Sequence, residues 1–168
     1  FRRTHLPQKD GEGPCFEDAD RAWAMFDFDK VENPWGLDPT SPEAMAYLRS
    51  LLPTQFHGAA CIFSLSASAG LTESDRISGH LWFVFERPVS NRELKSWLTN
   101  YPVDTTLFTP TQPHFTASPI FCDGRIDPVD VRNGLLAGRS DAVSVPNINT
   151  SRPAQAYQGG SQGLEGAL

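Results

Sequence analysis

Short apolar runs along the chain predict four strands between residues 20 and 138. Three of these runs, at 23–29, 59–65 and 80–85, have the composition of buried strands. A fourth run, at 115–121, is extended in character and follows a connection rich in Thr and Pro. The first run ends in two acidic residues, so its strand is expected to carry carboxylates at one end.

Between these runs, apolar residues recur at the spacing of a helix. Thr40 or Ser41 can cap a helix over residues 42–52, and Ser90 can cap another that ends near residue 101. Strands interleaved with helices predict an α+β fold, with an α/β-like mixed sheet flanked by helices.

Composition divides the chain into three parts. Residues 1–19 are polar, and we expect them to be a leader or the end of a missing N-terminal part, which would make the domain N-terminally truncated. Residues 20–138 are the predicted folded domain. Residues 139–168 are rich in Ser, Gly, Gln and Asn, so they are expected to form a flexible linker or disordered tail that buries too little apolar surface to fold.

Charge and composition exclude several classes of protein. The formal net charge of −6 argues against a protein that coats nucleic acid by charge alone, but allows an acidic site that binds metal. No apolar run is long enough for a membrane-spanning helix. The three cysteines are widely spaced and include no C-x-x-C pair, which disfavours a disulfide scaffold or a zinc ribbon and indicates a cytoplasmic setting. Cys61 and Cys122 lie in apolar runs and are expected to be buried.

Asp27 and Asp29 give the strongest chemical signal in the sequence. Residues two apart in a strand point to the same face, so their carboxylates would lie side by side. Such carboxylates repel each other unless a cation lies between them, and Mg²⁺ or Mn²⁺ prefers oxygen ligands of this kind. The alternative is a solvated strand end that carries two surface acids.

His80 and a third carboxylate are the next candidates. His80 opens a predicted strand after Ser78-Gly79, where it either serves a site or is a structural residue that merely caps the strand. A pair of metal ions needs a further acid, and the candidates are Asp104, Asp123 and Asp127. Asp123-Gly124 and Asp127-Pro128 are typical of turns, so Asp104 is preferred.

Serine and lysine residues near these acids suggest contacts to phosphate. In an extended segment the hydroxyls of Ser64, Ser66 and Ser68 would share one face, and Gly70 would let a phosphate approach closely. Lys30 follows the acidic pair directly. The chain contains no P-loop motif, and a Ser-rich strand end that leads into a loop explains the serines equally well.

Taken together, these motifs resemble the catalytic domain of primase-polymerases in the plasmid and phage branch of the archaeo-eukaryotic primase superfamily. The resemblance rests on MFDFD, FSLSASAG, SGHLWFVFERPV and Val103-Asp104, in that order, over roughly residues 20–138. It implies that Asp27, Asp29 and Asp104 hold two Mg²⁺ or Mn²⁺ ions and that His80 contacts the triphosphate. It further implies a primase that uses nucleoside triphosphates on a single-stranded DNA template, alongside a helicase or other replication protein.

Two other functions remain open at this point. A D-x-D nucleotide-sugar transferase would hold one metal ion on the donor diphosphate and would need neither His80 nor Asp104. A non-catalytic replication-initiation or DNA-binding module would use the sheet as a platform for nucleic acid, without any reaction at the acidic pair.

Overall fold

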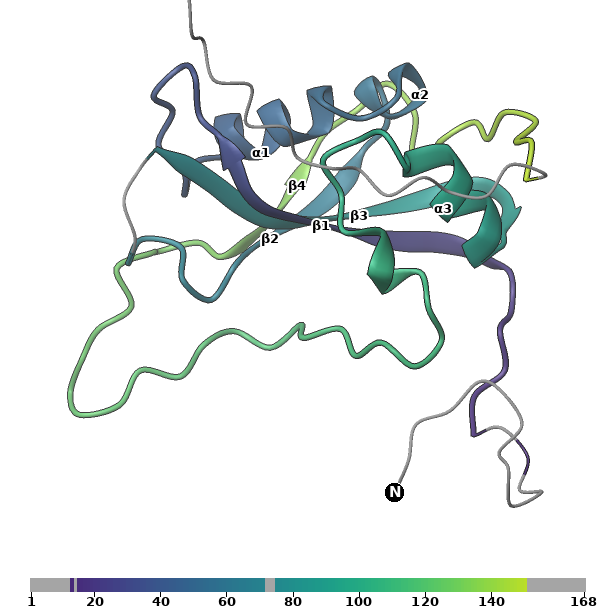
Figure 1. Cartoon of the computed structure of the whole chain (residues 1–168). Helices are drawn as coiled ribbons and strands as arrows, with labels where there is room; N and C mark the ends of the chain where they lie inside the picture. The colour runs from purple at the N-terminus through teal and green to yellow at the C-terminus, as the bar shows by residue number, and fades with distance from the viewer. Residues whose placement is uncertain (1–12, 14, 72–74, 151–168) are drawn as a thin grey trace, which may run out of the picture.

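An antiparallel sheet forms the centre of the fold (Figure 1). The computed structural model describes residues 13, 15–71 and 75–150. Within them, the sheet consists of β1 (Arg21–Glu32), β2 (Cys61–Leu65), β3 (Arg76–Val89) and β4 (Asn133–Leu136), in the order β1-β3-β2-β4. All three pairs of neighbouring strands are antiparallel. The α+β prediction is confirmed, whereas the predicted mixed sheet is wrong for the named strands. The primase-polymerase fold stays a prediction.

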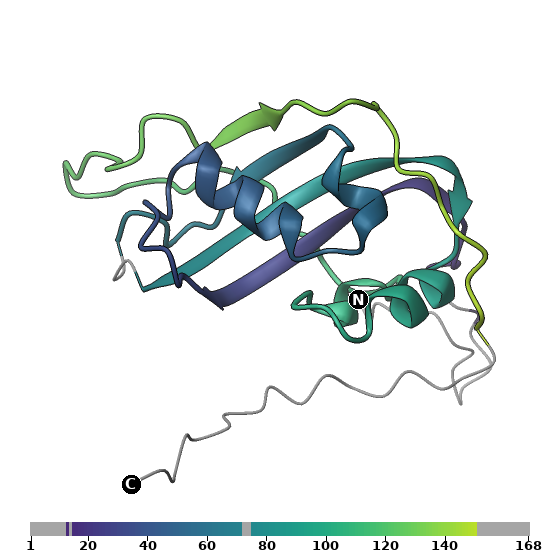
Figure 2. The same ribbon diagram turned by 90° about the horizontal axis from the view of Figure 1, so that it is seen from above.

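Two helices cover one face of this sheet, and a third lies beside the edge strand β1 (Figure 2). They are α1 (Pro42–Ser50), α2 (Thr54–His57) and α3 (Asn91–Leu98). Ser41 caps α1 by accepting a hydrogen bond from the backbone N–H of Ala44 at 3.1 Å. No helix in the described ranges has the length and apolar character that crossing a membrane requires.

The start of α3 follows the capping-box pattern. The Ser90 hydroxyl accepts a hydrogen bond from the Glu93 N–H, and the Glu93 carboxylate accepts one from the Ser90 N–H. Arg87 donates to the same carboxylate at 2.7 Å, and this hydrogen bond lowers the pKa of Glu93. The sequence therefore predicts both major helix starts correctly.

Aromatic rings fill the space between the sheet and the helices. Phe26 of β1, Phe83 of β3 and Phe56 of α2 are buried, and their ring centroids lie 5.0–5.4 Å apart. Trp97 of α3 packs 4.8 Å from Phe56. Gly134 of β4 lies opposite Phe63, where a Cβ would come within 2.5 Å of the Phe63 ring. The sheet face toward the helices is thus closely packed.

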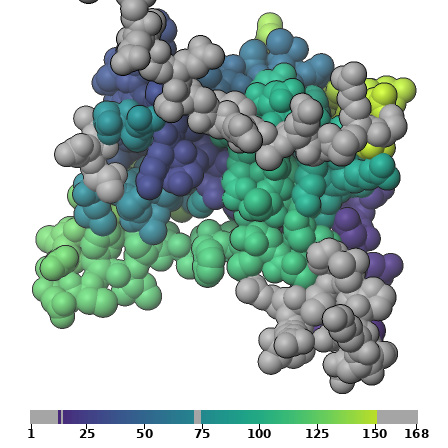
Figure 3. All heavy atoms as spheres, viewed as in Figure 1, coloured from purple at the N-terminus to yellow at the C-terminus, as the bar shows by residue number. Residues whose placement is uncertain are grey.

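The fourth strand lies in a different place from the one that the sequence predicts. Residues 115–121 form no strand, and the sheet is completed by β4 instead. The outer edge of β1 is already covered by the chain around η1 (Thr105–Leu107), where the Asp104 N–H donates to the Asp27 carbonyl at 3.0 Å. Residues 109–132 run along the side of the sheet opposite α1, and appear as a green band in Figure 3.

The packed part of the chain extends further than the sequence predicts. Residues 139–150, assigned to the tail, follow the sheet after β4, and Val143 is fully buried. The backbone of Val143 bonds to Val84 and Glu86 at the end of β3, where β2 gives no partner. Burial of the Val143 side chain and its backbone hydrogen bonds to the open edge of β3 hold this segment on the sheet, although its composition is polar. Residues 151–168 and most of the predicted leader lie outside the described residues.

The cysteines differ in burial. Cys61 is buried in β2, as predicted, and burial raises the pKa of its thiol to about 11. Cys122 is exposed, contrary to the prediction, because the segment that carries it forms no strand. Cys61 therefore acts as a small neutral core residue.

Candidate nucleotide and metal site

A row of polar residues crosses the sheet on the face opposite the helices. Asp27 of β1 pairs with His80 of β3, which pairs with Ser64 of β2, which pairs with Asn133 of β4. Directly paired residues in antiparallel strands point to the same face. The Nε2 atom of His80 lies 3.3 Å from Oδ1 of Asp27, whose side chain is 31% exposed. Asp27 and His80, which are 53 positions apart in sequence, are thus brought into contact by strand register alone.

Asp29 lies in a bulge of β1 that Ser78 holds in place. The register shifts between Phe28 and Val31, and Lys30 has a φ of 53°, in the left-handed region. The Ser78 hydroxyl accepts a hydrogen bond from the Lys30 N–H at 2.8 Å and lies 3.4 Å from Oδ1 of Asp29. The bulge therefore fixes the end of the D-x-D motif and interrupts the regular pairing of β1 with β3 at Lys30.

The carboxylates of Asp27 and Asp29 lie on the same face of the sheet. They contact His80 and Ser78, which are two residues apart on β3 and so point to one side. Two residues of a strand span about 7 Å. The bulge preserves the shared face that the D-x-D spacing predicts.

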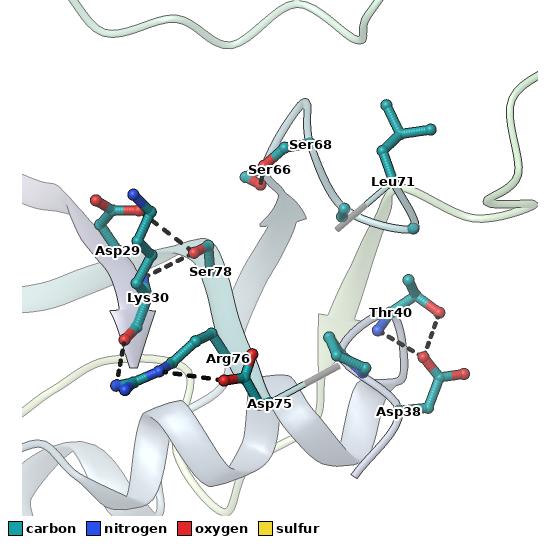
Figure 4. Close-up of a pocket in the computed structure, with 13 residues that line it drawn as sticks. Asp29, Lys30, Asp38, Thr40, Ser66, Ser68, Leu71, Asp75, Arg76 and Ser78 are labelled. Carbon is teal, nitrogen blue, oxygen red and sulfur yellow. Dashed lines mark hydrogen bonds and ion pairs between the residues drawn. The ribbon is translucent and has the colours of Figure 1, made fainter. Parts of the chain in front are cut away.

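A pocket of about 630 Å³ opens at this end of the strands (Figure 4). Asp29, Lys30, Ser66, Ser68, Arg76 and Ser78 line it. Asp38 and Asp75 also line it, so three carboxylates face two cations, an excess of one negative charge. Arg76 lies 3.8 Å from Asp75 and 3.4 Å from the Lys30 carbonyl. The volume and the mixture of hydroxyls and cations suit a phosphorylated ligand whose charge is partly balanced by a cation.

The serines reach this pocket in a way that the sequence analysis does not predict. Ser64 lies in β2, but the strand ends at Leu65, and Ser66 and Ser68 belong to a turn in which their hydroxyls lie 3.0 Å apart. The prediction of one extended segment is therefore wrong. Ser66 and Ser68 line the pocket, whereas Ser64 stands in the row beside His80.

The three candidates for a third acid have different surroundings. Asp104 lies next to Asp27 through its backbone, but its carboxylate accepts hydrogen bonds from the N–H and hydroxyl of Thr106 at 2.9 and 2.8 Å. Asp123 lies exposed in a turn with a φ of 59°. Asp127 is bound by Arg132. Asp104 is hydrogen-bonded to the D-x-D motif through its backbone, and its role as a ligand stays a prediction.

The donor set fits a divalent ion that is held by two carboxylates. Among the described residues, no three His, Cys, Asp or Glu side chains gather in a group that could hold a metal ion. Mg²⁺ commonly binds through one or two carboxylates, with water and substrate phosphates as its other ligands. Asp27 and Asp29 match that pattern beside a pocket of suitable size. The Asp104 carboxylate accepts one hydrogen bond from Thr106 on each oxygen, and each oxygen keeps a second lone pair that a metal ion could use.

Arg132 holds the turn that brings Ser66 and Ser68 to the pocket. Its buried guanidinium donates to both carboxylate oxygens of Asp127, at 2.6 and 2.7 Å, and to the carbonyls of Ser66 and Ala69. At Gly70, with a φ of 78°, a Cβ would come within 2.8 Å of Val129. The pocket wall thus depends on a contact between two segments more than 60 residues apart.

This contact predicts a specific dependence of stability on pH. The hydrogen bonds from Arg132 hold the pKa of Asp127 below its ordinary value of 3.8, so their stabilisation is complete above that pH and is lost as the pH falls through the lowered pKa. We expect Asp127→Asn to lower the melting temperature at pH 7, and the difference from the unmodified protein to shrink as the pH falls below 3.8. Asp130→Asn, an exposed neighbouring acid, is the control. A difference that stays constant with pH would contradict this role of Asp127.

Sequence reasoning gives the acids and His80 but misses part of their surroundings. Ser78 is recognisable afterwards, because it precedes His80 by two residues and so shares its face. The pairing of Arg132 with Asp127 and the position of Asn133 leave no sequence signal, since both depend on the placement of β4.

The chain matches no family model, and no curated protein or solved structure is significantly similar to it. Any functional conclusion therefore depends on the residues and their geometry.

Proposed function

We propose that this chain is a metal-dependent nucleotidyltransferase that synthesises primers on single-stranded DNA, as in the primase-polymerases of plasmid and phage replication. The observation that carries the proposal is the contact of His80 with Asp27, on the same sheet face as Asp29, beside a pocket lined by Lys30 and Arg76. We further propose a cytoplasmic setting and a helicase or other replication protein as partner.

Each residue of the site has a separate role in the proposed nucleotidyl transfer. Asp27 and Asp29 would hold Mg²⁺ or Mn²⁺, which when bound would activate the attacking 3′-oxygen and neutralise the departing pyrophosphate. Lys30 and Arg76 supply positive charge for the triphosphate, and Ser66 and Ser68 supply hydroxyl donors. Asp27 also orients His80. In the imidazolium form both ring nitrogens donate, so one can stay on Asp27 while the other binds a phosphate oxygen.

A primer-synthesis assay tests this proposal. The chain is incubated with single-stranded DNA, labelled nucleotides and Mg²⁺ or Mn²⁺, with EDTA in a parallel reaction. We expect labelled product only where the divalent ion is available. Absence of product with either ion, under conditions in which the chain is folded and binds DNA, would contradict the proposal.

Substitution of His80 separates this proposal from a nucleotide-sugar transferase. We expect His80→Ala to slow nucleotide incorporation by about a hundredfold, because a donor to the developing phosphate charge is lost. His57→Ala, in α2 on the opposite side of the sheet, is the control and should retain activity. An unchanged rate in His80→Ala would favour the D-x-D transferase, which needs no histidine here.

A non-catalytic DNA-binding module is the second candidate, because the polar row shares its sheet face with exposed apolar side chains. Trp23, Ile62 and Val84 are all about half exposed on that face. Of these, Trp23 has an aromatic ring on which a base could stack. In this case Asp27→Ala would leave DNA binding intact and no divalent-ion-dependent synthesis would be detected in the unmodified chain.

A further inference from the structure

A second pocket, of about 300 Å³, lies on the same sheet face as the acidic pair. Trp23 and Met25 of β1 and Trp82 of β3 form its floor, and Phe108, Gln112 and His114 line it from the segment that follows η1. The centroids of the two indole rings lie 5.9 Å apart and their planes are inclined by 30°. Trp23 remains 46% exposed, so part of its indole ring is accessible to a ligand.

The charges at this pocket favour an anionic ligand. Arg21 lines it, with its guanidinium carbon 5.6 Å from the centroid of the Trp23 ring. Lys95 donates to Thr109, another lining residue, at 2.9 Å. None of the described lining residues carries a carboxylate, although the whole chain has a net charge of −6. An aromatic floor with cations at its rim is the combination that binds single-stranded nucleic acid.

The strand register relates this pocket to the acidic pair. Trp82 lies two residues beyond His80 on β3, and Trp23 lies four residues before Asp27 on β1. These separations correspond to about 7 and 13 Å along the strands, and the alternation of side chains places all four residues on one face. A nucleic acid strand held at Trp23 would therefore pass close to Asp27 and His80.

We propose that this pocket binds one base of single-stranded DNA, stacked on Trp23, with Arg21 and Lys95 beside the backbone phosphates. The choice of ligand rests on the proposed function, but the site itself would also serve a module that binds DNA without catalysis. The pocket thus holds the template strand, and the larger pocket at Asp29 holds the nucleotide.

Binding of a short fluorescein-labelled oligothymidylate in EDTA tests this assignment without catalysis. Trp23→Leu keeps an apolar side chain but loses the ring, and we expect it to weaken binding by about 5- to 150-fold, the range for one base stack. Trp23→Phe should restore most of the affinity. Trp35→Leu, at an exposed tryptophan in the turn after β1, is the matched control and should bind within about twofold of the unmodified chain.

Three outcomes would overturn the assignment. Equal affinity of Trp23→Leu and Trp35→Leu for the oligothymidylate would show that Trp23 does not bind the base. Weakened binding of a nucleoside triphosphate with unchanged binding of the oligonucleotide would place the incoming base in this pocket instead. In the unmodified chain, tryptophan fluorescence that stays unchanged at saturating oligothymidylate would also contradict stacking, whether or not the variants fold.

The failure of the proposed function is distinguishable from the failure of this assignment. If binding depends on Trp23 but no primer is synthesised, the assignment of the pocket stands and the proposed enzymatic function is wrong. If the unmodified chain synthesises primers and Trp23→Leu binds the oligonucleotide normally, the enzymatic function stands and the assignment of the pocket is wrong.

Discussion

Replacement of Asp27 by Asn should reduce primer synthesis by about a thousandfold or more. Asn keeps the size of the side chain but removes the negative charge that would hold a divalent ion and that faces His80 at 3.3 Å. Loss of several kcal/mol of charge stabilisation in the transition state corresponds to a rate effect of this order. The measurement is the initial rate of nucleotide incorporation on single-stranded DNA at saturating Mn²⁺. Asp29→Asn should have a comparable effect.

The control for this substitution is Asp123→Asn. Asp123 is exposed in a turn with a φ of 59°, a conformation that Asn tolerates, so this variant removes one carboxylate without strain. It should synthesise primers at the rate of the unmodified chain. Melting temperatures of Asp27→Asn and Asp123→Asn within a few degrees of each other would show that the loss is chemical. A folded Asp27→Asn variant with activity reduced only a few-fold would contradict the role of Asp27.

Replacement of Phe56 by Ala should have the largest effect on stability. Phe56 is fully buried in α2, and its ring contacts Phe26, Phe83, Phe85 and Trp97. Removal of a buried phenylalanine ring typically costs 3–5 kcal/mol, through lost apolar burial and the cavity that remains. We expect a loss of about 4 kcal/mol in the free energy of unfolding, measured by urea denaturation.

The neighbouring Gln55 gives the matched control for Phe56. Gln55 is exposed on the same short helix, so Gln55→Ala should change the free energy of unfolding by less than about 0.5 kcal/mol. A loss below about 1 kcal/mol in Phe56→Ala would mean that α2 does not join the sheet to α3 as the ring contacts indicate.

Local patterns predict the elements that local forces determine. The caps at Ser41 and Ser90 and the apolar runs of β1, β2 and β3 each carry their own signal, and all are found. The four residues of β4 carry none, because Gly134 suits its position only through the ring of Phe63 opposite. The apolar run at 115–121 predicts a strand, but this segment forms none. The outer edge of β1, with which it could have paired, is covered by the chain around η1.

The same distinction applies to the candidate site. The D-x-D spacing predicts the shared face of Asp27 and Asp29, and the strand start predicts His80 in the same region. That His80 meets Asp27 in particular depends on the register of two strands about 50 residues apart, which the sequence does not specify. The bulge at Lys30 and the turn at Ser66 are likewise set by distant partners, Ser78 and Arg132.

Binding of Mn²⁺, followed by electron paramagnetic resonance, tests the central claim most directly. Titration of the chain with Mn²⁺ should show saturable loss of the free-ion signal. The double variant Asp27→Asn, Asp29→Asn should show no such loss, and Asp123→Asn should behave as the unmodified chain. Binding that is absent from the unmodified chain, or that survives in the double variant, would contradict a divalent-ion site at Asp27 and Asp29.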